Sequence, residues 1–434
     1  MSRIAFLTKD GVFLPMALRC IDEGHDCRVF WTKKHPGTNA LMIGKGLVTA
    51  APSLPDLLRW KPEAIIADST GMGAICDNLR TAGFPVYGGS RIADELEFDR
   101  DGSLALCQEL GVPVPKTAVF KTFPEAQAFV KSEKSTYVIK LDGEAYAGSS
   151  LTFVPDSPEE TREVLSAYQK VVKGKVDILL QEKVHGVEVT SEGFWNGNRW
   201  EESFWNHTLE KKKLMNDDVG PNTGCAGDVL MAARRDRLVE QSIARLAPML
   251  LKTNFYGQID INTIVSLQDQ KVYALELTPR FGINASLTFM SMWATEMGEW
   301  FLRVGRRGSP EIRVANSYGA SVTVSVPPFP GTKSDGVTSG VPVLMPDPPI
   351  PHEGEKVFPN LNLFGVRKED GHLVTVGFDG WVASPAGQGA SIPQAVQRSY
   401  RLVRALKTPN KQYRTDIGPD AERDEHSLRR GLWI

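Results

Sequence analysis

Residues 3–90 constrain the fold most, because short apolar runs alternate there with helical patterns. In chain order, these segments are 4–7, 13–22, 27–31, 64–67, 74–82 and 86–87. Such an alternation predicts a parallel sheet with helices on its faces. Ligands of such sheets bind beyond the carboxyl ends of the strands. We therefore expect substrate contacts in the loops 8–11 and 68–73, the first of which contains Asp10 and Gly11.

Length and composition favour a multidomain protein without a strong charge. The chain has 434 residues, of which 41% are hydrophobic and 24% charged, and its formal net charge is -2. Single cores stop growing at roughly 250–300 residues, so several subdomains are expected. A net charge this small predicts neither nucleic-acid binding nor attraction to a membrane. Any phosphate binding must then be local.

The cysteines and the amino terminus favour a cytoplasmic protein. The five cysteines are Cys20, Cys27, Cys76, Cys107 and Cys225, with no C-x-x-C spacing. An odd number without that spacing favours neither a disulfide framework nor a zinc site. The chain enters a strand directly at residue 3, and no uncharged apolar span of 18 residues occurs. We expect neither secretion nor a membrane span.

The remaining chain divides into three further regions by its local patterns. Two S/T-x-x-E patterns, at 122–125 and 157–160, predict helix starts on either side of a strand at 137–140, as in a small α+β lid. Further on we expect an amphipathic helix at 232–252, strands at 258–265 and 271–277, turns at 369–371 and 378–380, and a helix at 392–406. The predicted domains are 1–112, 113–192, 193–320 and 321–434, the last mostly antiparallel and partly barrel-like.

Two local motifs carry the strongest chemical signal. Gly220-Pro221-Asn222-Thr223-Gly224 predicts a rigid turn beside bound phosphate. The run 275–282, Leu-Glu-Leu-Thr-Pro-Arg-Phe-Gly, predicts a buried strand that ends in a carboxylate and an arginine. A carboxylate suits magnesium and an arginine suits an acid. Together the two motifs indicate phosphoryl-transfer chemistry.

Lys140 is a candidate phosphate ligand because it closes a β-branched strand before a loop of small residues, 142–150. Backbone N–H groups of such a loop can cradle phosphate. The alternative is a solvated lysine at a strand end. The next strand, 179–184, turns polar at its end and is followed by Glu188, so it could offer backbone groups to an adenine and a carboxylate to a ribose. This order of elements is the outline of an ATP-grasp lid.

Asp260, Asn262 and Glu276 are candidate metal ligands. They lie on two consecutive strands, so an antiparallel pairing would bring Asp260 or Asn262 close to Glu276. Two oxygen ligands with phosphate oxygens suit magnesium. The alternative is the solvated face of a hairpin. The apolar neighbours favour burial, and a buried carboxylate needs a cation or hydrogen bonds.

The basic run Lys211-Lys212-Lys213 and Cys225 flank the glycine-rich motif. A basic run is usually a solvated face, but the position before the motif makes one of the lysines a candidate phosphate ligand. No histidine stands at a recognisable spacing from Cys225, so a small packed thiol is favoured over a nucleophile.

With these residues assembled, the chain resembles the phosphoribosylamine–glycine ligases, which belong to the ATP-grasp superfamily. The resemblance runs essentially end to end. It is carried by 84–90, 138–140, 220–224, 276–282 and the tail 413–418. It implies an N-terminal pre-ATP-grasp domain, an ATP-grasp lid and base, and a C-terminal β-rich domain.

The resemblance also implies roles for individual residues. Lys140, Lys212 and Arg280 would take part in catalysis. The residues implied for ATP binding are Arg100, Lys140, Ser149, Ser150, Glu182, Lys183, Val184, Glu188, Lys212 and Asn222. Those implied for substrate binding are Asp10, Gly11, Gly224, Arg280 and Asn284, and those for the metal are Glu276, Thr278, Asp260 and Asn262.

Several positions depart from the family pattern. The segment 8–15 replaces a glycine-rich turn followed by Arg-Glu-His, and Arg100 stands where the family has lysine. Thr278 replaces an asparagine of the metal strand, and 283–285 replaces an acidic Asp-Pro-Glu. The first and last of these changes affect the places where the amine and the amino acid would be recognised.

The sequence thus predicts an ATP-dependent carboxylate–amine ligase that forms an amide through an acyl phosphate. The expected cofactors are ATP and Mg²⁺ or Mn²⁺, the substrates are an amino acid such as glycine and an amine, and the protein is expected to be a monomer or homodimer. One alternative is a diverged ligase that joins an amino acid to a different amine. The other is an ATP-binding protein without turnover.

Overall fold

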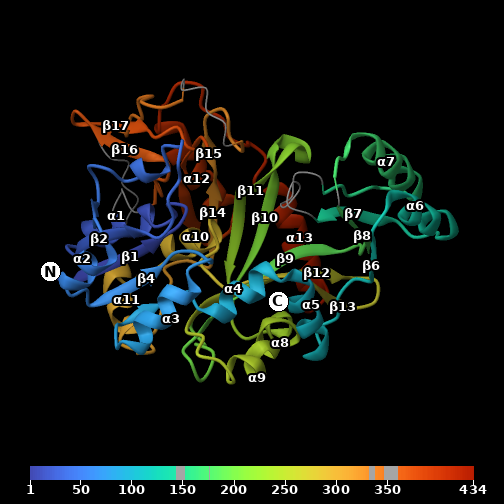
Figure 1. Ribbon diagram of the computed structural model, residues 1–434, viewed down its shortest axis with the longest axis horizontal. Coiled ribbons are helices and arrows are strands. Elements are labelled where there is room, and N and C mark those ends of the chain that lie inside the picture. Colours follow the sequence, from blue (N-terminus) through green and yellow to red (C-terminus); the bar gives the residue numbers. More distant parts are fainter. Residues whose placement is uncertain (143–151, 175, 332–337, 347–359) are drawn as a thin grey trace.

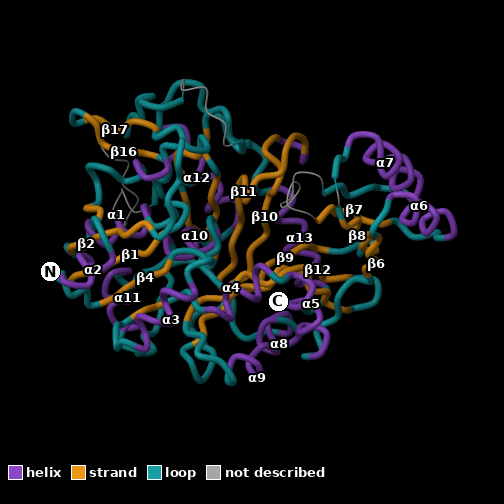
Figure 2. Tube along the Cα trace, viewed as in Figure 1, coloured by secondary structure: helices purple, strands orange, loops and turns teal. Residues whose placement is uncertain are grey.

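The computed structural model describes residues 1–142, 152–174, 176–331, 338–346 and 360–434. Three bodies are visible in Figure 1: an N-terminal α/β part, a central antiparallel sheet and a small α+β part that projects to one side. Figure 2 shows that helices cover the outside of the first two, while the long central strands cross the middle of the molecule.

The N-terminal sheet is parallel, as predicted. Its five strands have the order β3-β2-β1-β4-β5. Their bounds are β1 (Arg3–Thr8), β2 (Asp26–Trp31), β3 (Thr49–Ala50), β4 (Ala64–Ala67) and β5 (Val86–Tyr87). The accompanying helices are α1 (Leu14–Asp22), η1 (Ala40–Met42), α2 (Leu54–Arg59), α3 (Gly73–Thr81), α4 (Arg91–Phe98) and α5 (Arg100–Glu109). Apolar side chains of β1 and β4 are buried on both faces, as expected for a covered parallel sheet.

The projecting part is the predicted lid. It holds a three-stranded antiparallel sheet of order β6-β8-β7, with β6 (Thr117–Phe120), β7 (Tyr137–Asp142) and β8 (Asp177–Glu182). Its helices are α6 (Phe123–Ser132) and α7 (Pro158–Val171), which begin after the predicted caps Thr122 and Ser157. Their hydroxyls accept hydrogen bonds from Glu125 and Glu160, as N-caps do. The lid has a small hydrophobic core of its own.

The central sheet has seven strands in the order β13-β12-β9-β10-β11-β14-β19. The strands that follow the lid are β9 (Val187–Trp195), β10 (Asn206–Met215), β11 (Val219–Ala232), β12 (Gly257–Ser266) and β13 (Lys271–Thr278). From the later chain come β14 (Tyr318–Val322) and β19 (Ala386–Gly389). Helices α10 (Ala285–Ser291) and α11 (Met297–Gly305) lie between the two large sheets, where Tyr87, Phe194 and Trp300 pack together.

Two local predictions were wrong. The motif 220–224 is not a turn but part of β11, because the turn is made by the preceding η3 (Asn216–Asp218), where Asp217 and Asp218 have positive φ. The helix expected at 232–252 is broken into α8 (Arg237–Gln241), η4 (Ile243–Leu246) and α9 (Ala247–Leu250). The break falls at Ser242, whose backbone leaves the helical region.

The C-terminal third contributes two small sheets besides its two strands in the central sheet. They are β15–β18 (Val324–Ser325 with Trp381–Ala383) and β16–β17 (Val366–Glu369 with His372–Thr375). The predicted helix is α12 (Ile392–Ala405), and α13 (Pro419–Arg430) follows it. The domain boundaries stay predictions, and the central sheet crosses two of them, since β9 starts before 193 and β14 and β19 come from near or beyond 320. Within the described residues, no helix has the length and apolar character needed to cross a bilayer.

Candidate functional site

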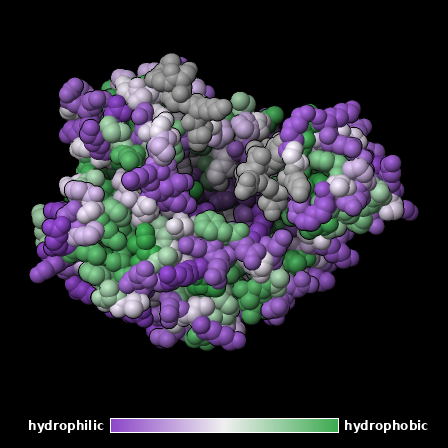
Figure 3. Space-filling model, viewed as in Figure 1, coloured by the Kyte–Doolittle hydropathy of each residue, from purple (hydrophilic) through white to green (hydrophobic). Residues whose placement is uncertain are grey.

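The lid and the central sheet bring predicted site residues together at one place. Lys140 comes from β7 of the lid, Glu188 from β9, Lys212 from β10 and Glu276 from β13. Each of the other three alters the pKa of Lys140, as does Arg100 at the start of α5. In Figure 3 the surface is hollowed between the lid and the rest of the molecule, and hydrophilic residues lie in the hollow.

Ion pairs organise the wall of this cleft on the central sheet. The Lys212 Nζ lies 2.8 Å from Glu188 Oε1, and the Arg100 Nη2 lies 3.4 Å from Glu276 Oε2. Burial lowers the pKa of Lys212, but the nearby carboxylates outweigh it and raise this pKa overall. Burial raises the pKa of Glu188 and of Glu276, but Lys212 and the other cations lower both overall. Lys212, Glu188 and Glu276 are therefore charged at neutral pH.

Lys140 has a different environment within the same cleft. Its Nζ donates a hydrogen bond to Gln181 Oε1 at 2.8 Å, and Gln181 in turn donates to Thr117 Oγ1. Burial, followed by the charge of Arg100, lowers the pKa of Lys140 to about 8. Bound phosphate would favour the charged form of Lys140, because a nearby opposite charge raises the pKa of a lysine.

The candidate metal ligands form two register pairs between β12 and β13. Asn262 stands opposite Glu276, and Asp260 stands opposite Thr278. Asn262 Nδ2 donates to Glu188 Oε1 at 3.1 Å, while its buried Oδ1 has no partner among the described residues. Glu276 lies opposite Asn262, and the Glu188 side chain reaches Asn262, so the three side chains offer neighbouring oxygens, the ligand type that magnesium takes together with phosphate oxygens.

The donor set on the protein side is small. No cluster of three or more His, Cys, Asp or Glu that could hold a metal occurs within the described ranges. Magnesium usually keeps waters and takes only one or two carboxylates from the protein. A few oxygens beside bound phosphates fit that preference, so the residues present fit a magnesium–nucleotide complex.

The predicted adenine hinge follows β8. The N–H groups of Glu182 and Lys183 donate to the carbonyls of Lys116 and Thr136. The Lys183 Nζ contacts Pro155 O and Asp156 Oδ1, so this side chain is used within the lid. The N–H of Val184 has no backbone partner in the described part of the chain.

Asn222, another predicted ATP ligand, lies on the β10–β11 hairpin. Asn222 is opposite Lys213, and the Thr223 hydroxyl donates to the Lys212 carbonyl at 2.9 Å. This bond fixes the backbone that carries Lys212. Gly224 is exposed, and a Cβ there would approach Ile283. Ser149 and Ser150 lie outside the described residues.

Arg280 and Asn284 follow β13 in the chain. The Arg280 Nε lies 3.3 Å from Glu97 Oε1, and its Nη1 donates to the Phe281 carbonyl. Asn284 is buried and its amide is already used, since it donates to Thr323 Oγ1 and accepts from Ser384 Oγ. Arg280 thus contacts α4 and the end of its own strand, whereas the Asn284 side chain links α10 to Thr323 and Ser384.

Asp10 and Gly11 lie apart from this cluster, in the loop after β1. Beside them, the Thr8 hydroxyl donates to Asp68 Oδ2 at 2.6 Å, and the Gly11 N–H donates to the Thr8 hydroxyl. Burial raises the pKa of Asp68 to about 7. The loops after β1 and β4 therefore form one polar edge of the parallel sheet, where the sequence predicted substrate contacts.

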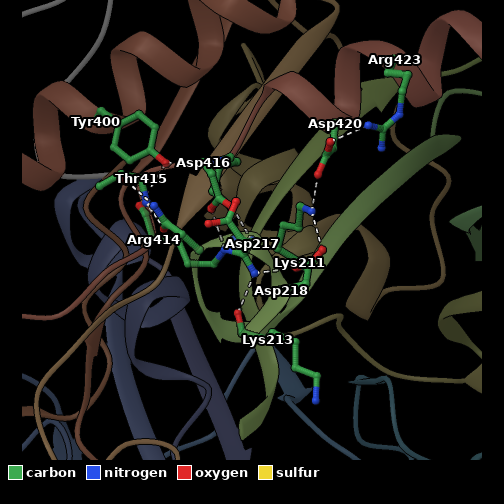
Figure 4. Close-up of polar contacts among 12 residues, drawn as sticks. Lys211, Lys213, Asp217, Asp218, Tyr400, Arg414, Thr415, Asp416, Asp420 and Arg423 are labelled. Carbon is green, nitrogen blue, oxygen red and sulfur yellow. Dashed lines mark hydrogen bonds and ion pairs between the residues drawn. The ribbon is translucent and has the colours of Figure 1, made fainter. Parts of the chain in front are cut away.

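Burial and ion pairs bear on two alternatives from the sequence, one for Cys225 and one for Lys211. All five cysteines are buried and free, and burial holds the pKa of Cys225 well above its usual value, which supports a packed thiol. The solvated-face alternative is wrong for Lys211, whose Nζ lies 2.8 Å from Asp218 and 2.6 Å from Asp420 (Figure 4).

Sequence reasoning missed several polar residues on the inner face of the central sheet. They are Glu192, Asn206, Glu210, Asp228 and Gln258. Gln181, which lies on β8 of the lid and contacts Lys140, was missed as well. The only local signal was the alternation of Glu188, Thr190 and Glu192 along β9, which marks one polar face of a strand. The other residues gather only through strand order and register.

Part of the chain matches a known family of domains, and most of it matches curated proteins. The model of the phosphoribosylglycinamide synthetase ATP-grasp (A) domain matches residues 100–282, which include the lid and strands β9 to β13. A phosphoribosylamine–glycine ligase from a Nostoc strain is 27% identical over 79% of this chain and 80% of its own length.

Solved structures agree with the fold. The crystal structure of phosphoribosylamine–glycine ligase from Thermotoga maritima matches with a TM-score of 0.65 and 21% identity, over 95% of this chain and 99% of its own. A biotin carboxylase domain from Hydrogenobacter thermophilus, solved with MgADP and bicarbonate, matches with a TM-score of 0.58 and 14% identity, over 94% and 91%.

Proposed function

Because the chain belongs to the phosphoribosylamine–glycine ligase family of ATP-grasp proteins, we propose that it is an ATP-dependent ligase that joins a carboxylate to an amine. ATP phosphorylates the carboxylate to an acyl phosphate and leaves as ADP. The amine then attacks the acyl carbon, phosphate leaves, and an amide remains. The observation that carries this proposal is the cluster of Lys140, Lys212, Glu188 and Glu276 between lid and sheet.

The proposed roles follow from charge and position. Lys140 and Lys212 would bind the ATP phosphates and stabilise the charge that moves with the phosphoryl group. Glu188 would accept hydrogen bonds from the ribose, and Arg280 would orient the carboxylate that is phosphorylated. The N–H of Val184 would meet the adenine. Ser149, Ser150 and Asn222 stay proposed phosphate contacts.

Divalent metal and ATP form one unit in this proposal. Glu276 and Asn262 would hold the ion, with Glu188 beside them, and its charge would offset that of the phosphates. Thr278 and Asp260 form the next pair on the same face of the two strands and stay proposed metal contacts. Mg²⁺ is the proposed ion, since the donors are few oxygens.

The amine would approach from the N-terminal sheet. The loops after β1 and β4, which contain Asp10, Gly11 and Asp68, lie at the carboxyl ends of their strands, where such sheets bind ligands. We propose this edge as the amine site. We place the reaction in the cytoplasm, in keeping with five unpaired cysteines, and expect a monomer or homodimer to suffice.

The test is ADP release by the purified protein with magnesium-ATP, glycine and freshly generated phosphoribosylamine, beside a panel of other amino acids and amines. Release that requires an acid and an amine together supports the ligase. ATP binding without acid-dependent ADP release from any pair would contradict it. Lys140→Ala with unchanged ADP release would contradict the proposed site.

A second candidate keeps the chemistry and changes the substrates. It is supported by the segment 283–285, because the Asn284 amide is used by Thr323 and Ser384 and does not replace an acidic group in the cleft. In the same panel, this candidate predicts ADP release with an acid other than glycine.

A further inference from the structure

The seven-stranded central sheet consists of two parts that are joined over a short distance. Strands β13, β12 and β9 form one part, and β10, β11, β14 and β19 form the other. Among the described residues, β9 is paired with β10 only over 190–192 and 206–208. The same strand is paired with β12 along its whole length, 187–195. The pairing of β9 with β10 is therefore a short joint between two extended parts.

The proposed ATP site lies across this joint. Glu188 and Glu276 belong to the first part, on β9 and β13, whereas Lys212 belongs to the second, on β10. The Lys212 Nζ lies 2.8 Å from Glu188 Oε1, although neither residue takes part in the pairing of the two strands. In Figure 1, β10 and β11 run upward while β9 and β12 run towards the lid. The distance between Lys212 and the two carboxylates therefore depends on the angle at the joint.

A buried histidine links the two parts on the face of the sheet opposite the cleft. His207 on β10 stands directly opposite Ser191 on β9, and its Nδ1 lies 2.9 Å from Ser191 Oγ. Because side chains alternate along a strand, Ser191 points away from the face that carries Glu188. The exposed fraction is 0% for Ser191 and 1% for His207. Water therefore does not compete for this hydrogen bond.

The second ring nitrogen of His207 is held as well. Its Nε2 lies 2.9 Å from Asp236 Oδ2. Because an ionised carboxylate only accepts hydrogen bonds, Nε2 carries a hydrogen and donates it to Asp236. Nδ1 accepts from the Ser191 hydroxyl when the ring is neutral and donates to it when the ring is protonated, so the link persists in both states. Asp236 is fixed in turn, since its Oδ1 accepts from the Val239 N–H as the N-cap of α8.

The link between His207 and Ser191 lies next to the end of the joint. Thr190 with Thr208 is the last register pair towards the cleft. From this pair, Glu188 lies two residues along β9 and Lys212 four residues along β10. These segments span about 7 Å and about 13 Å, so a small change of angle at the joint is enlarged at their ends. A misplacement of about 1 Å at a reacting group can cost about 100-fold in rate.

We propose that His207 is a positioning residue of the ATP site. Held by Asp236, it fixes β10 against β9 through Ser191 and thereby sets the distance between Lys212 and Glu188. Because it lies on the opposite face of the sheet, His207 acts through Lys212 and not by contact with the nucleotide. This inference rests on the proposed function, in which Lys212 binds the ATP phosphates.

The test compares two nucleotides that differ in the phosphates available to Lys212. Calorimetry measures the Kd of MgADP and of AMP for the full-length wild-type protein, for Ser191→Ala and for His207→Phe. We expect wild-type protein to bind MgADP at least about tenfold more tightly than AMP, because AMP lacks a phosphate that forms charged hydrogen bonds. Each variant should lower this preference at least about threefold by weakening MgADP, and should leave the Kd of AMP within about twofold.

Ser399→Ala is the matched control. The Ser399 hydroxyl is also fully buried, and it donates to the Pro385 carbonyl at 2.7 Å, beside the edge strand β19. The control loses one buried hydrogen bond, as Ser191→Ala does, so thermal melting should show similar losses of stability. Only Ser191→Ala should change the preference for MgADP. Similar losses of stability with an unchanged preference in both variants would overturn the inference.

The Lys212→Met background separates positioning from a general loss of structure. Adding Ser191→Ala to Lys212→Met should weaken MgADP by less than about twofold further, because the contact that His207 positions is already absent. A further loss as large as in the wild-type background would show a structural role alone and overturn the inference.

The same measurements distinguish failure of the inference from failure of the proposed function. Wild-type protein that binds neither nucleotide contradicts the proposed function, and the positioning role falls with it. Wild-type protein that prefers MgADP, with the same preference in Ser191→Ala and His207→Phe, overturns only the positioning role and leaves the ligase standing. His207→Phe keeps the test decisive where Ser191→Ala fails to fold, since the two variants change different strands.

Discussion

The two faces of β10 carry neighbouring lysines in opposite surroundings. On the outer face, Lys211 contacts Asp218 and Asp420, and the buried Arg414 holds Asp218 and Asp416 (Figure 4). The acids on the outer face therefore form ion pairs with cations of the protein itself.

On the inner face, Lys212 pairs with Glu188, while Glu192 and Asp260 have no ion-pair partner in the described residues. On the outer face, the charged side chains form ion pairs with one another. The inner face leaves charge to be completed by ligands, which is what distinguishes a binding site from a structural network.

Replacing Lys212 by methionine should impair the function of the inner face, with the largest effect of the changes predicted here. The side chain keeps its length and loses the charge that faces the phosphates, so ADP release should fall about 10²–10³-fold. Steady-state kinetics of ADP release measure this loss. Lys211→Met is the matched control on the outer face and should retain turnover within about threefold while lowering stability. Equal kinetic losses in both variants would remove the distinction between the faces.

Replacing Arg414 by methionine should break the outer face. Arg414 is nearly fully buried and donates to Asp416, Asp218 and the Lys213 carbonyl. The free energy of unfolding should fall by about 2–4 kcal/mol, less than for a fully buried pair because both carboxylates are partly exposed. Urea unfolding followed by tryptophan fluorescence measures it. Arg423→Met, which removes an exposed partner of Asp420, should cost under about 1 kcal/mol.

Glu192→Gln should sharpen the comparison through its pH dependence. The pKa of Glu192 is raised from 4.5 to about 7, so the folded state holds this proton more tightly than the unfolded chain. Stability contributed by the protonated form is therefore lost as pH rises from about 4.5 to 7.

The variant should flatten that decline and gain about 1–3 kcal/mol of stability at pH 8. Unfolding curves measured from pH 5 to 8 provide the comparison. A decline of the same slope in Glu192→Gln would show that this carboxylate is not the buried charge.

The smallest expected effect concerns Lys140. Because burial lowers its pKa to about 8, Lys140 of the free protein loses its positive charge as pH rises through 8. Above that pH, nucleotide binding must be accompanied by the uptake of a proton on Lys140. ATP affinity should fall about tenfold between pH 7 and 9. Fluorescence titration with a nucleotide analogue measures it. Lys140→Arg keeps its charge at pH 9, so its affinity should stay flat over this range.

The sequence was sufficient for elements whose signal is local. The alternation in residues 3–90 predicted the parallel sheet, and Thr122 and Ser157 marked the lid helices. Asp260 and Asn262 could not be told apart, because the choice between them depends on the register of β12 against β13. Glu192 and Asp228 were missed because β9 and β11 are separated in the sequence. Only the strand order, with β10 between them, places the two side chains on the same face of one sheet. The contact of Arg414 with Asp218 joins residues 196 positions apart, and no local pattern encodes it.

The order of strands in the central sheet has a consequence for a nascent chain. The lid is complete once Glu182 has left the ribosome, since its strands and its core are all local. The central sheet must wait, because β11 keeps an open edge until Tyr318–Val322 arrives, and that strand in turn waits for Ala386–Gly389. An exposed edge pairs readily with other chains. During synthesis this protein therefore carries a folded lid on an unfinished base, and that interval is when we expect it to depend most on chaperones.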